Sequence, residues 1–435
     1  MFKNQSNFLS LWISIKLYID VLSQKYDSIW RTRKRIIGTA FLIVFIFKLV
    51  LGKNKQGYNS ILVEMWHNLV FTALPFAQKK PLAASSVCEA RMKLPEQIFK
   101  DLNSSFVKEF EKTNNSLFWN GYRLFGIDGS KINLPRELIA QGYNIHSKLA
   151  YYPQGLLSCL YELSTELPYD FDLVSHGNER ECAIKHLHLL GPKDIVIMDR
   201  GYFSYFLLRQ FFNKNVKVIF RLQRKAGKAF NAFWNSNKLE DTIMLPPSPK
   251  ALKKLKNKNA QPIPLRLIKY TISGKTYVLA TTLFGEQFSR QTFSELYHLR
   301  WFEEEAFKVS KNLINVEDFH AKSLRGIKQE LFAHFCIITL SRILEHKATL
   351  DINPKLDSNN YAFRKFSQTL KINFKNCILV ISKAIEDIVF LKIPIFISSL
   401  LPKLMISISR LYHKIRPNRQ NRRISHKPRT KWSPA

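Results

Sequence analysis

The sequence has few acidic residues and few cysteines. Asp and Glu total 33 against 67 Lys and Arg, which gives a formal net charge of +34 at pH 7. This excess is larger than solubility requires and attracts polyanions, first of all nucleic acid; an anionic membrane and structural nucleic-acid binding are the alternatives. The five cysteines are scattered along the chain, which excludes a local zinc knuckle and argues against a disulfide framework. The net charge therefore indicates a polyanionic partner, but it does not indicate what the protein does to that partner.

The sequence also lacks a long uninterrupted apolar segment. The most apolar run covers residues 36–51, and Lys48 interrupts it, whereas a membrane-spanning helix needs about 20 apolar residues. No signal-peptide cleavage pattern follows the first residues. Apolar residues make up 46% of the chain, which is enough for a folded core. We therefore expect a folded protein without membrane contact, in which residues 36–51 form a buried helix.

The spacing of apolar residues changes along the chain. Residues 1–115 show helical spacing, whereas shorter β-rich runs begin near Phe118. The segment 118–134 predicts two strands joined by a turn at Gly129-Ser130, and the segment 264–284 predicts a hairpin. Further strands are expected at 155–163, 194–199 and 216–223, and helices at 178–190, 200–212, 290–313, 325–350 and 376–413.

Two acidic residues lie where strands are expected. Asp128 lies on an early strand, and Asp199 closes a short apolar run. Strand ends and adjoining helices converge in a mixed sheet, so these acids can share a site with a third carboxylate from a later helix. Such a set suits phosphoryl transfer, in which two divalent ions about 4 Å apart activate the attacking oxygen and stabilise the leaving one. Taken alone, Asp128 is more simply a turn residue and Asp199 a helix N-cap.

Helical phase selects the third acid. At about 100° per residue, residues at offsets of zero, three, seven and fourteen fall on one helix face. The residues with these offsets are Tyr297, Arg300, Glu304 and Lys311. The neighbouring Glu303 and Glu305 point about 100° away on either side. A carboxylate that lies between cations on one face can bind a metal ion while the cations bind phosphates.

These motifs resemble those of the DDE transposases of the insertion-sequence-four family. YHLRWFEEEAFKVSK (297–311) matches the family signature Y-x2-R-x3-E-x6-K. GIDGSKINLP (126–135) and IVIMDRGYFSYFLL (195–208) resemble the motifs of its first and second acids. The resemblance implies a ribonuclease H-like catalytic domain that binds the terminal inverted repeats of its own element. It also implies that the enzyme hydrolyses a DNA strand and joins the freed 3′ end to target DNA.

The resemblance assigns roles to individual residues. It implies that Asp128, Asp199 and Glu304 are catalytic and hold two Mg²⁺ ions, for which Mn²⁺ can substitute. The residues expected to bind DNA are Tyr297, Arg300, Lys311, Arg200 and Trp301. Core packing is the alternative for the two aromatic residues, and surface ion pairing is the alternative for Arg300 and Lys311.

The expected fold class is α/β: a ribonuclease H-like catalytic domain with a β-rich insertion, flanked by helical N- and C-terminal regions. The N-terminal region is expected to bind the DNA ends, and the insertion and the tail are basic. The boundaries in chain order are 1–115 (N-terminal region), 116–223 with 289–345 (catalytic domain), 224–288 (insertion), 346–415 (C-terminal region) and 416–435 (tail).

The expected partner is double-stranded DNA, both element ends and target. Because two ends must be brought together, we expect a homodimer in the DNA complex. We expect the protein in the bacterial cytoplasm, associated with the nucleoid when bound. Two other functions stay open: a nuclease of ribonuclease H-like fold that does not join strands, and a DNA-binding product of a decayed element. The acids alone do not separate cleavage from joining, whereas the presence of all three argues against decay.

Overall fold

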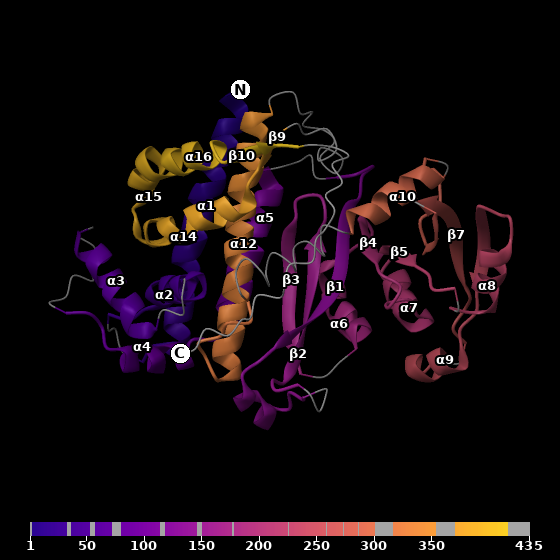
Figure 1. Ribbon diagram of the computed structural model, residues 1–435, viewed down its shortest axis with the longest axis horizontal. Coiled ribbons are helices and arrows are strands. Elements are labelled where there is room, and N and C mark those ends of the chain that lie inside the picture. Colours follow the sequence, from indigo (N-terminus) through magenta and orange to yellow (C-terminus); the bar gives the residue numbers. More distant parts are fainter. Residues whose placement is uncertain are drawn as a thin grey trace.

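The computed structural model combines a central β-sheet with a large layer of helices (Figure 1). The structure describes residues 2–32, 36–52, 57–71, 80–113, 118–145, 150–175, 178–224, 226–257, 259–272, 274–285, 287–300, 316–353 and 370–415.

The sheet has eight strands in the order β3-β2-β1-β4-β5-β8-β7-β6. Their bounds are β1 (Arg123–Asn133), β2 (Gln154–Glu162), β3 (Leu167–Val174), β4 (Asp194–Met198), β5 (Lys217–Arg221), β6 (Glu240–Leu245), β7 (Ile263–Ile272) and β8 (Lys275–Thr281). The pairs β1/β4 and β4/β5 are parallel and the other pairs are antiparallel. The sheet is therefore mixed and mostly antiparallel, and its parallel part lies at the centre.

Helices from both ends of the chain form one layer beside the sheet (Figure 1). Its members are α1 (Phe2–Trp30), α2 (Thr39–Leu51), α3 (Tyr58–Phe71), α4 (Ala84–Lys93), α5 (Gln97–Thr113), α12 (Leu324–Ile352), α14 (Phe374–Phe390), α15 (Ile393–Ile395), the π-helical turn η4 (Phe396–Leu400) and α16 (Leu401–Ser409). Two short strands, β9 (Leu370–Ile372) and β10 (Tyr412–Lys414), pair within this layer. The helix α12 packs against β3 on one side and against α2, α5, α14 and α16 on others, so it joins the layer to the sheet.

The remaining helical elements lie close to the sheet. They are the 3-10 helices η1 (Arg136–Gln141) and η2 (Leu187–Leu189), and the helices α6 (Glu179–His186), α7 (Tyr205–Asn213), α8 (Lys228–Asn235), α9 (Pro249–Leu255) and α10 (Arg290–Leu299). Two apolar clusters cover opposite faces of the sheet because side chains alternate along each strand. Leu124 and Ile197 pack with the helical layer, whereas Phe125 and Val196 pack with α6 and α7.

The apolar run 36–51 forms the buried helix α2, as the sequence predicted. Ten of its residues are buried, and they pack against α1, α12 and α14. Lys48, the one charged residue of the run, pairs with Glu64 and Glu386 at 2.7 and 2.8 Å. Within the described parts of the chain, no helix is both long and apolar enough to cross a bilayer.

Two predicted elements were wrong in detail. Residues 123–133 form one strand and not two, because β1 pairs with β2 without a break from Phe125↔Glu162 to Asn133↔Gln154. The helix expected from residue 200 starts at Tyr205, because residues 199–202 form a turn and Ser204 caps the helix by accepting a hydrogen bond from the Leu207 amide. In both places tertiary pairing or a better cap overrides the local pattern.

The hairpin predicted at 264–284 is confirmed as β7 and β8, with Gly274 at a φ of 76° in the turn. The strands of region 224–288 do not form a sheet of their own. β8 pairs with β5 through Phe220↔Ala280 and continues the central sheet. The β-rich segment between the second and third predicted acids therefore widens the sheet that carries the acids.

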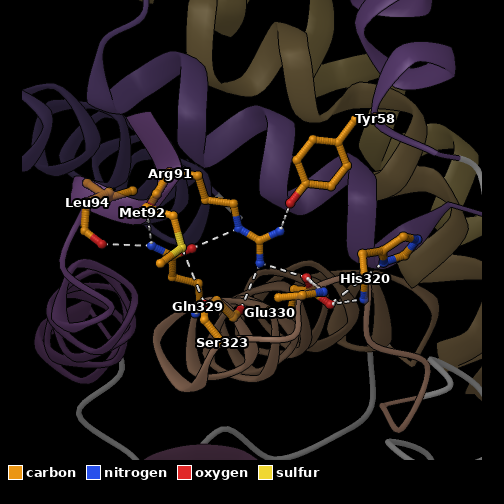
Figure 2. A network of polar contacts seen from close by, with 10 residues as sticks. Tyr58, Arg91, Met92, Leu94, His320, Ser323, Gln329 and Glu330 are labelled. Carbon is orange, nitrogen blue, oxygen red and sulfur yellow. Dashed lines mark hydrogen bonds and ion pairs between the residues drawn. The ribbon is translucent and has the colours of Figure 1, made fainter. Parts of the chain in front are cut away.

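A buried polar network ties α3 and α4 to α12 (Figure 2). The Arg91 guanidinium pairs with Glu330 at 2.6 Å and also donates to Tyr58 and to the Gly326 carbonyl. Arg91 and Glu330 are 2% and 1% exposed. Glu330 in turn accepts hydrogen bonds from the backbone amides of His320 and Ala321 at 2.9 and 3.0 Å. One ion pair thus fixes the N-terminal helices, α12 and the loop that precedes α12.

We predict that Glu330→Gln destabilises the protein by about 3–5 kcal/mol, because it leaves the Arg91 charge buried without its partner. Thermal unfolding should show a clearly lower Tm. Glu137→Gln, which removes the carboxylate of the exposed pair with Lys322, is the matched control and should change stability by less than about 1 kcal/mol. Equal shifts for the two variants would contradict a supporting role for the buried pair.

A second prediction concerns His334 on α12. Burial lowers the pKa of His334 to about 4, from 6.5. His334 therefore binds a proton more readily in the unfolded chain than in the folded one. Its contribution to the free energy of unfolding is complete above pH 6.5 and is lost as pH falls toward 4. The loss should reach about 3 kcal/mol. Thermal unfolding between pH 7 and 4.5 should show a shallower decline for His334→Gln than for the wild type; parallel declines would refute this.

Candidate active site

The parallel pairing of β1 and β4 brings two predicted acids together. The register runs from Arg123↔Asp194 to Gly126↔Ile197. Asp128 and Asp199 each lie two positions beyond the last pair, and neighbouring strands are about 4.8 Å apart. Alternation along the strands places both side chains on the face that Leu124 and Ile197 share with the helical layer.

The sequence around Asp199 explains why this acid lies at a strand end. The five residues of β4 are all buried, and β4 pairs in parallel with a strand on each side. Apolar runs of this kind are typical of the centre of a parallel sheet. After Asp199 the Tyr202 amide donates to the Asp199 carbonyl and closes a turn. Because Ser204 caps α7, the side chain of Asp199 does not act as the helix cap.

Asp128 lies in a largely buried environment. Burial raises the pKa of Asp128 to about 6; the hydrogen bond from the Gly129 amide, at 2.9 Å, and the charge of Arg300 oppose that rise. The charges of Glu179 and Asp199 raise the pKa further. Close carboxylates repel each other, so this environment favours a bound cation or proton.

Asp199 has two partners from elements beyond its own strand. The Tyr297 hydroxyl on α10 donates to its Oδ1 at 3.0 Å, and Arg221 Nη1 at the end of β5 lies 3.9 Å from the same oxygen. The Arg221 guanidinium also lies over the Tyr277 ring of β8, 4.9 Å from its centre. The sequence analysis did not identify Arg221, although this residue ends the strand that follows the second acid motif.

Tyr297 contacts Asp199, and the charge of Arg300 acts on Asp128, but both residues are buried. They are 6% and 5% exposed, and the Arg300 guanidinium lies 5.6 Å from the centre of the Tyr297 ring. Burial raises the pKa of Tyr297 to about 12, and the charge of Asp199 adds to this rise. The shared helix face was predicted correctly for these two residues. That face is directed toward the acids, and little of either side chain is exposed to solvent.

Glu179 approaches the acid motifs from the opposite face of the sheet. It is the first residue of α6, which Asn178 caps by accepting from the amides of Arg180 and Glu181. A Cβ on Gly129 would lie 3.0 Å from Glu179 Cγ, and a Cβ on Gly201 would lie 3.7 Å from its Oε2. The two glycines therefore leave the room that Glu179 occupies. Burial and the charge of Asp199 raise the pKa of Glu179.

Three predicted site residues, Glu304, Lys311 and Trp301, lie outside the described residues. Arg200, next to Asp199, is exposed. Across the ranges that are described, no group of three or more His, Cys, Asp or Glu side chains could hold a metal ion. Asp128 and Asp199 supply two carboxylates on one face, which are ligands that Mg²⁺ prefers. Their chemistry fits a divalent metal ion, and they are two of the three acids predicted to bind it.

A Ser-His-Asp arrangement lies near the acids. His186 Nδ1 is 2.8 Å from Asp170 Oδ2, and its Nε2 is 3.0 Å from Ser158 Oγ. Burial opposes ionisation of Asp170, but the hydrogen bond and charge of His186, with Lys100, outweigh it and lower the pKa of Asp170 to about 2. Ser158 is 1% exposed and lies opposite Gly129 in the β1/β2 ladder. The three side chains are spaced as in a nucleophilic triad, but a substrate cannot reach the buried Ser158 hydroxyl. Their hydrogen bonds therefore serve to hold α6 against β2 and β3.

Comparison with known families agrees with this geometry. The family model described as "Transposase DDE domain" matches residues 119–340, which include Asp128, Asp199 and Tyr297. The chain belongs to the DDE transposase family. The match covers β1 to β8, α10 and most of α12.

A relative supports the insertion-sequence-four type. The chain is 23% identical over 269 residues to "Transposase InsG for insertion sequence element IS4" of Escherichia coli (strain K12). The aligned part is 60% of this chain and 61% of that protein, so it spans less than two thirds of the relative. A solved piggyBac transposase synaptic complex with hairpin DNA covers 94% of this chain and 85% of its own, at 10% identity and a TM-score of 0.42.

The Ser158–His186–Asp170 group is predicted to be structural. A fluorophosphonate probe should leave Ser158 unmodified in the folded chain, as judged by peptide mass spectrometry, because the hydroxyl is buried. His186→Ala should cost about 1–3 kcal/mol of stability, because Ser158 and Asp170 lose their buried partner. Labelling of Ser158 in the native protein would show instead that the group is accessible and reactive.

Proposed function

We propose that this DDE transposase binds the terminal inverted repeats of its element, cleaves DNA there and joins the 3′ ends to target DNA. One observation carries the proposal: Asp128 and Asp199 lie on one face, each two positions beyond the last residue pair of the parallel strands β1 and β4. The motif match adds Glu304 as the third acid. Because two element ends must meet, the active complex is proposed to be a homodimer on DNA.

The catalytic domain is proposed to be ribonuclease H-like, formed by residues 116–223 and 289–345. The five strands β3-β2-β1-β4-β5 support this, because β1 lies between an antiparallel pair of strands and a parallel pair. The helices α6 and α7 cover one face, and α12 packs on the other side at β3. Region 224–288 is then an insertion that enters and leaves beside β5.

Asp128, Asp199 and Glu304 are the residues that would hold two Mg²⁺ ions. When bound, the ions would supply Lewis-acid stabilisation to the attacking and leaving oxygens of a phosphoryl transfer. The chain itself contributes the positions of the acids, since Asp128 is fixed by the β1 ladder and Asp199 by the turn after β4. Partial burial of both acids limits competing water and strengthens the attraction of a cation.

The DNA is proposed to reach the acids across the end of β4 and β5. Arg200 is exposed and Arg221 is about one-third exposed there, so both can contact phosphates. Arg300 is proposed to act from a buried position, where its charge opposes the rise in the pKa of Asp128. The lysines of α9, on the insertion, add sequence-independent attraction.

The test is strand joining by the full chain in the presence of Mg²⁺. The substrate is a duplex that carries the inverted repeat bordering the gene, pre-cut at its 3′ end, with a plasmid as target. The wild type should join the two DNAs, and EDTA should abolish joining. Asp128→Asn and Asp199→Asn should each lower the rate on the order of 1,000-fold, because each removes several kcal/mol of metal-mediated stabilisation.

Asp241→Asn is the matched control, because Asp241 lies on β6 and pairs with Lys238. It should leave joining within about twofold of the wild type. If the wild type nicks DNA in Mg²⁺ but joins none, the nuclease alternative is correct. If Asp128→Asn changes no activity, the acids do not carry the reaction.

A further inference from the structure

We propose that Tyr297 is a positioning residue for Asp199 and not a contact to DNA. This inference rests on the proposed function and adds to it a role for the first residue of the family signature. Its basis is the hydrogen bond of 3.0 Å from the Tyr297 hydroxyl to Asp199 Oδ1.

The burial of Tyr297 separates the role of its ring from that of its hydroxyl. The ring belongs to the apolar cluster between the sheet and the helical layer, which also contains Phe293 and Leu296 of the same helix. Phenylalanine would fill that space equally well. The hydroxyl is the part that packing does not require, and it is directed at an acid. A buried tyrosine hydroxyl takes a partner because leaving it unpaired is costly.

Asp199 is a side chain that needs such support. It follows the last paired residue of β4, Met198, and about one-third of its side chain is exposed. An aspartate at a strand end can rotate between several conformations. The hydrogen bond from Tyr297 holds Oδ1, and Arg221, at 3.9 Å, reinforces the same orientation. A carboxylate has about four lone-pair positions, so it keeps the capacity to bind a cation.

The geometry argues against a direct role of Tyr297 in DNA binding. The side chain is 6% exposed, its hydroxyl is engaged by Asp199, and the Arg300 guanidinium lies 5.6 Å from the ring centre. A phosphate or base would have to displace these groups to reach it. The exposed cations nearby, Arg200 and Arg221, are better placed for that purpose.

The hydrogen bond also joins two distant parts of the chain. Asp199 and Tyr297 are 98 residues apart, and the segment between them includes the whole insertion. Seven positions separate Tyr297 from Glu304 (304 − 297). Tyr297 therefore fixes the second acid to the end of the helix from which the chain continues to the third.

The experiment compares Tyr297→Phe with the wild type at three readouts. In the joining assay with saturating DNA, the rate should fall about 10- to 100-fold, the effect of losing one hydrogen bond to a charged group. The Kd for the same duplex, measured by gel shift in EDTA, should stay within twofold. The increase in Tm on adding Mn²⁺ should be smaller than for the wild type, because Asp199 is less well oriented.

Tyr270→Phe is the matched control. Tyr270 lies on β7 and stacks on Tyr277 with ring centres 5.4 Å apart, so the variant removes a nearby hydroxyl without touching an acid. All three readouts should stay close to the wild type. A double-mutant cycle with Asp199→Asn adds a second check: Tyr297→Phe should cause no further loss of the Mn²⁺-dependent rise in Tm once the acid is gone.

Two results would overturn the inference. A rise of tenfold or more in the Kd of Tyr297→Phe, with an unchanged rate at saturating DNA, would identify Tyr297 as a DNA contact. Unchanged values at all three readouts would show that the hydroxyl is idle. Failure of the proposed function is recognised separately, because the wild type would then neither join DNA nor differ from Asp128→Asn.

Discussion

The parallel pairing of β1 with β4 is the constraint on which the site depends. β4 is buried throughout and β1 is buried from Leu124 to Ile127, so burial of their apolar side chains drives the pairing. Register matters because side chains alternate: a slip of one residue in β4 would turn Asp199 to the other face of the sheet, away from Asp128. The placement of the two acids therefore depends on hydrophobic residues such as Ile195 and Ile197, which have no reactive groups themselves.

The sequence predicted the elements whose local pattern and tertiary environment agree. The run before Asp199 is apolar throughout and forms β4, and residues 36–51 form a buried helix. The Asp-Gly pair at 128–129 misled the prediction of a turn, since that pair favours turns but here lies within a continuous ladder. Local preference of about 1 kcal/mol is too small to outweigh cross-strand pairing.

Residues of the candidate site were predictable from the sequence where they lie in the motifs. They were not predictable where only the folded structure brings them near the acids. Helical phase put Tyr297 and Arg300 on one face, and they do lie together, but periodicity does not say whether that face meets DNA or protein. Glu179 and Arg221 have no sequence signal of comparable strength. They reach the acids because α6 crosses Gly129 and because β5 lies beside β4. Such contacts follow from strand order, which a single sequence does not give.

The insertion has a geometric property that bears on how such proteins diversify. The chain leaves the inner strands at β5 and returns at β8, which is hydrogen-bonded to β5, so the two ends of this segment are anchored side by side. Lengthening or shortening the part between them changes the closure entropy only slowly. The outer strands β6 and β7, with α8 and α9, can therefore be remodelled while α10 still starts from the same place. The surface of these outer elements can therefore evolve at a different pace from Asp128 and Asp199, whose positions are held by the inner strands.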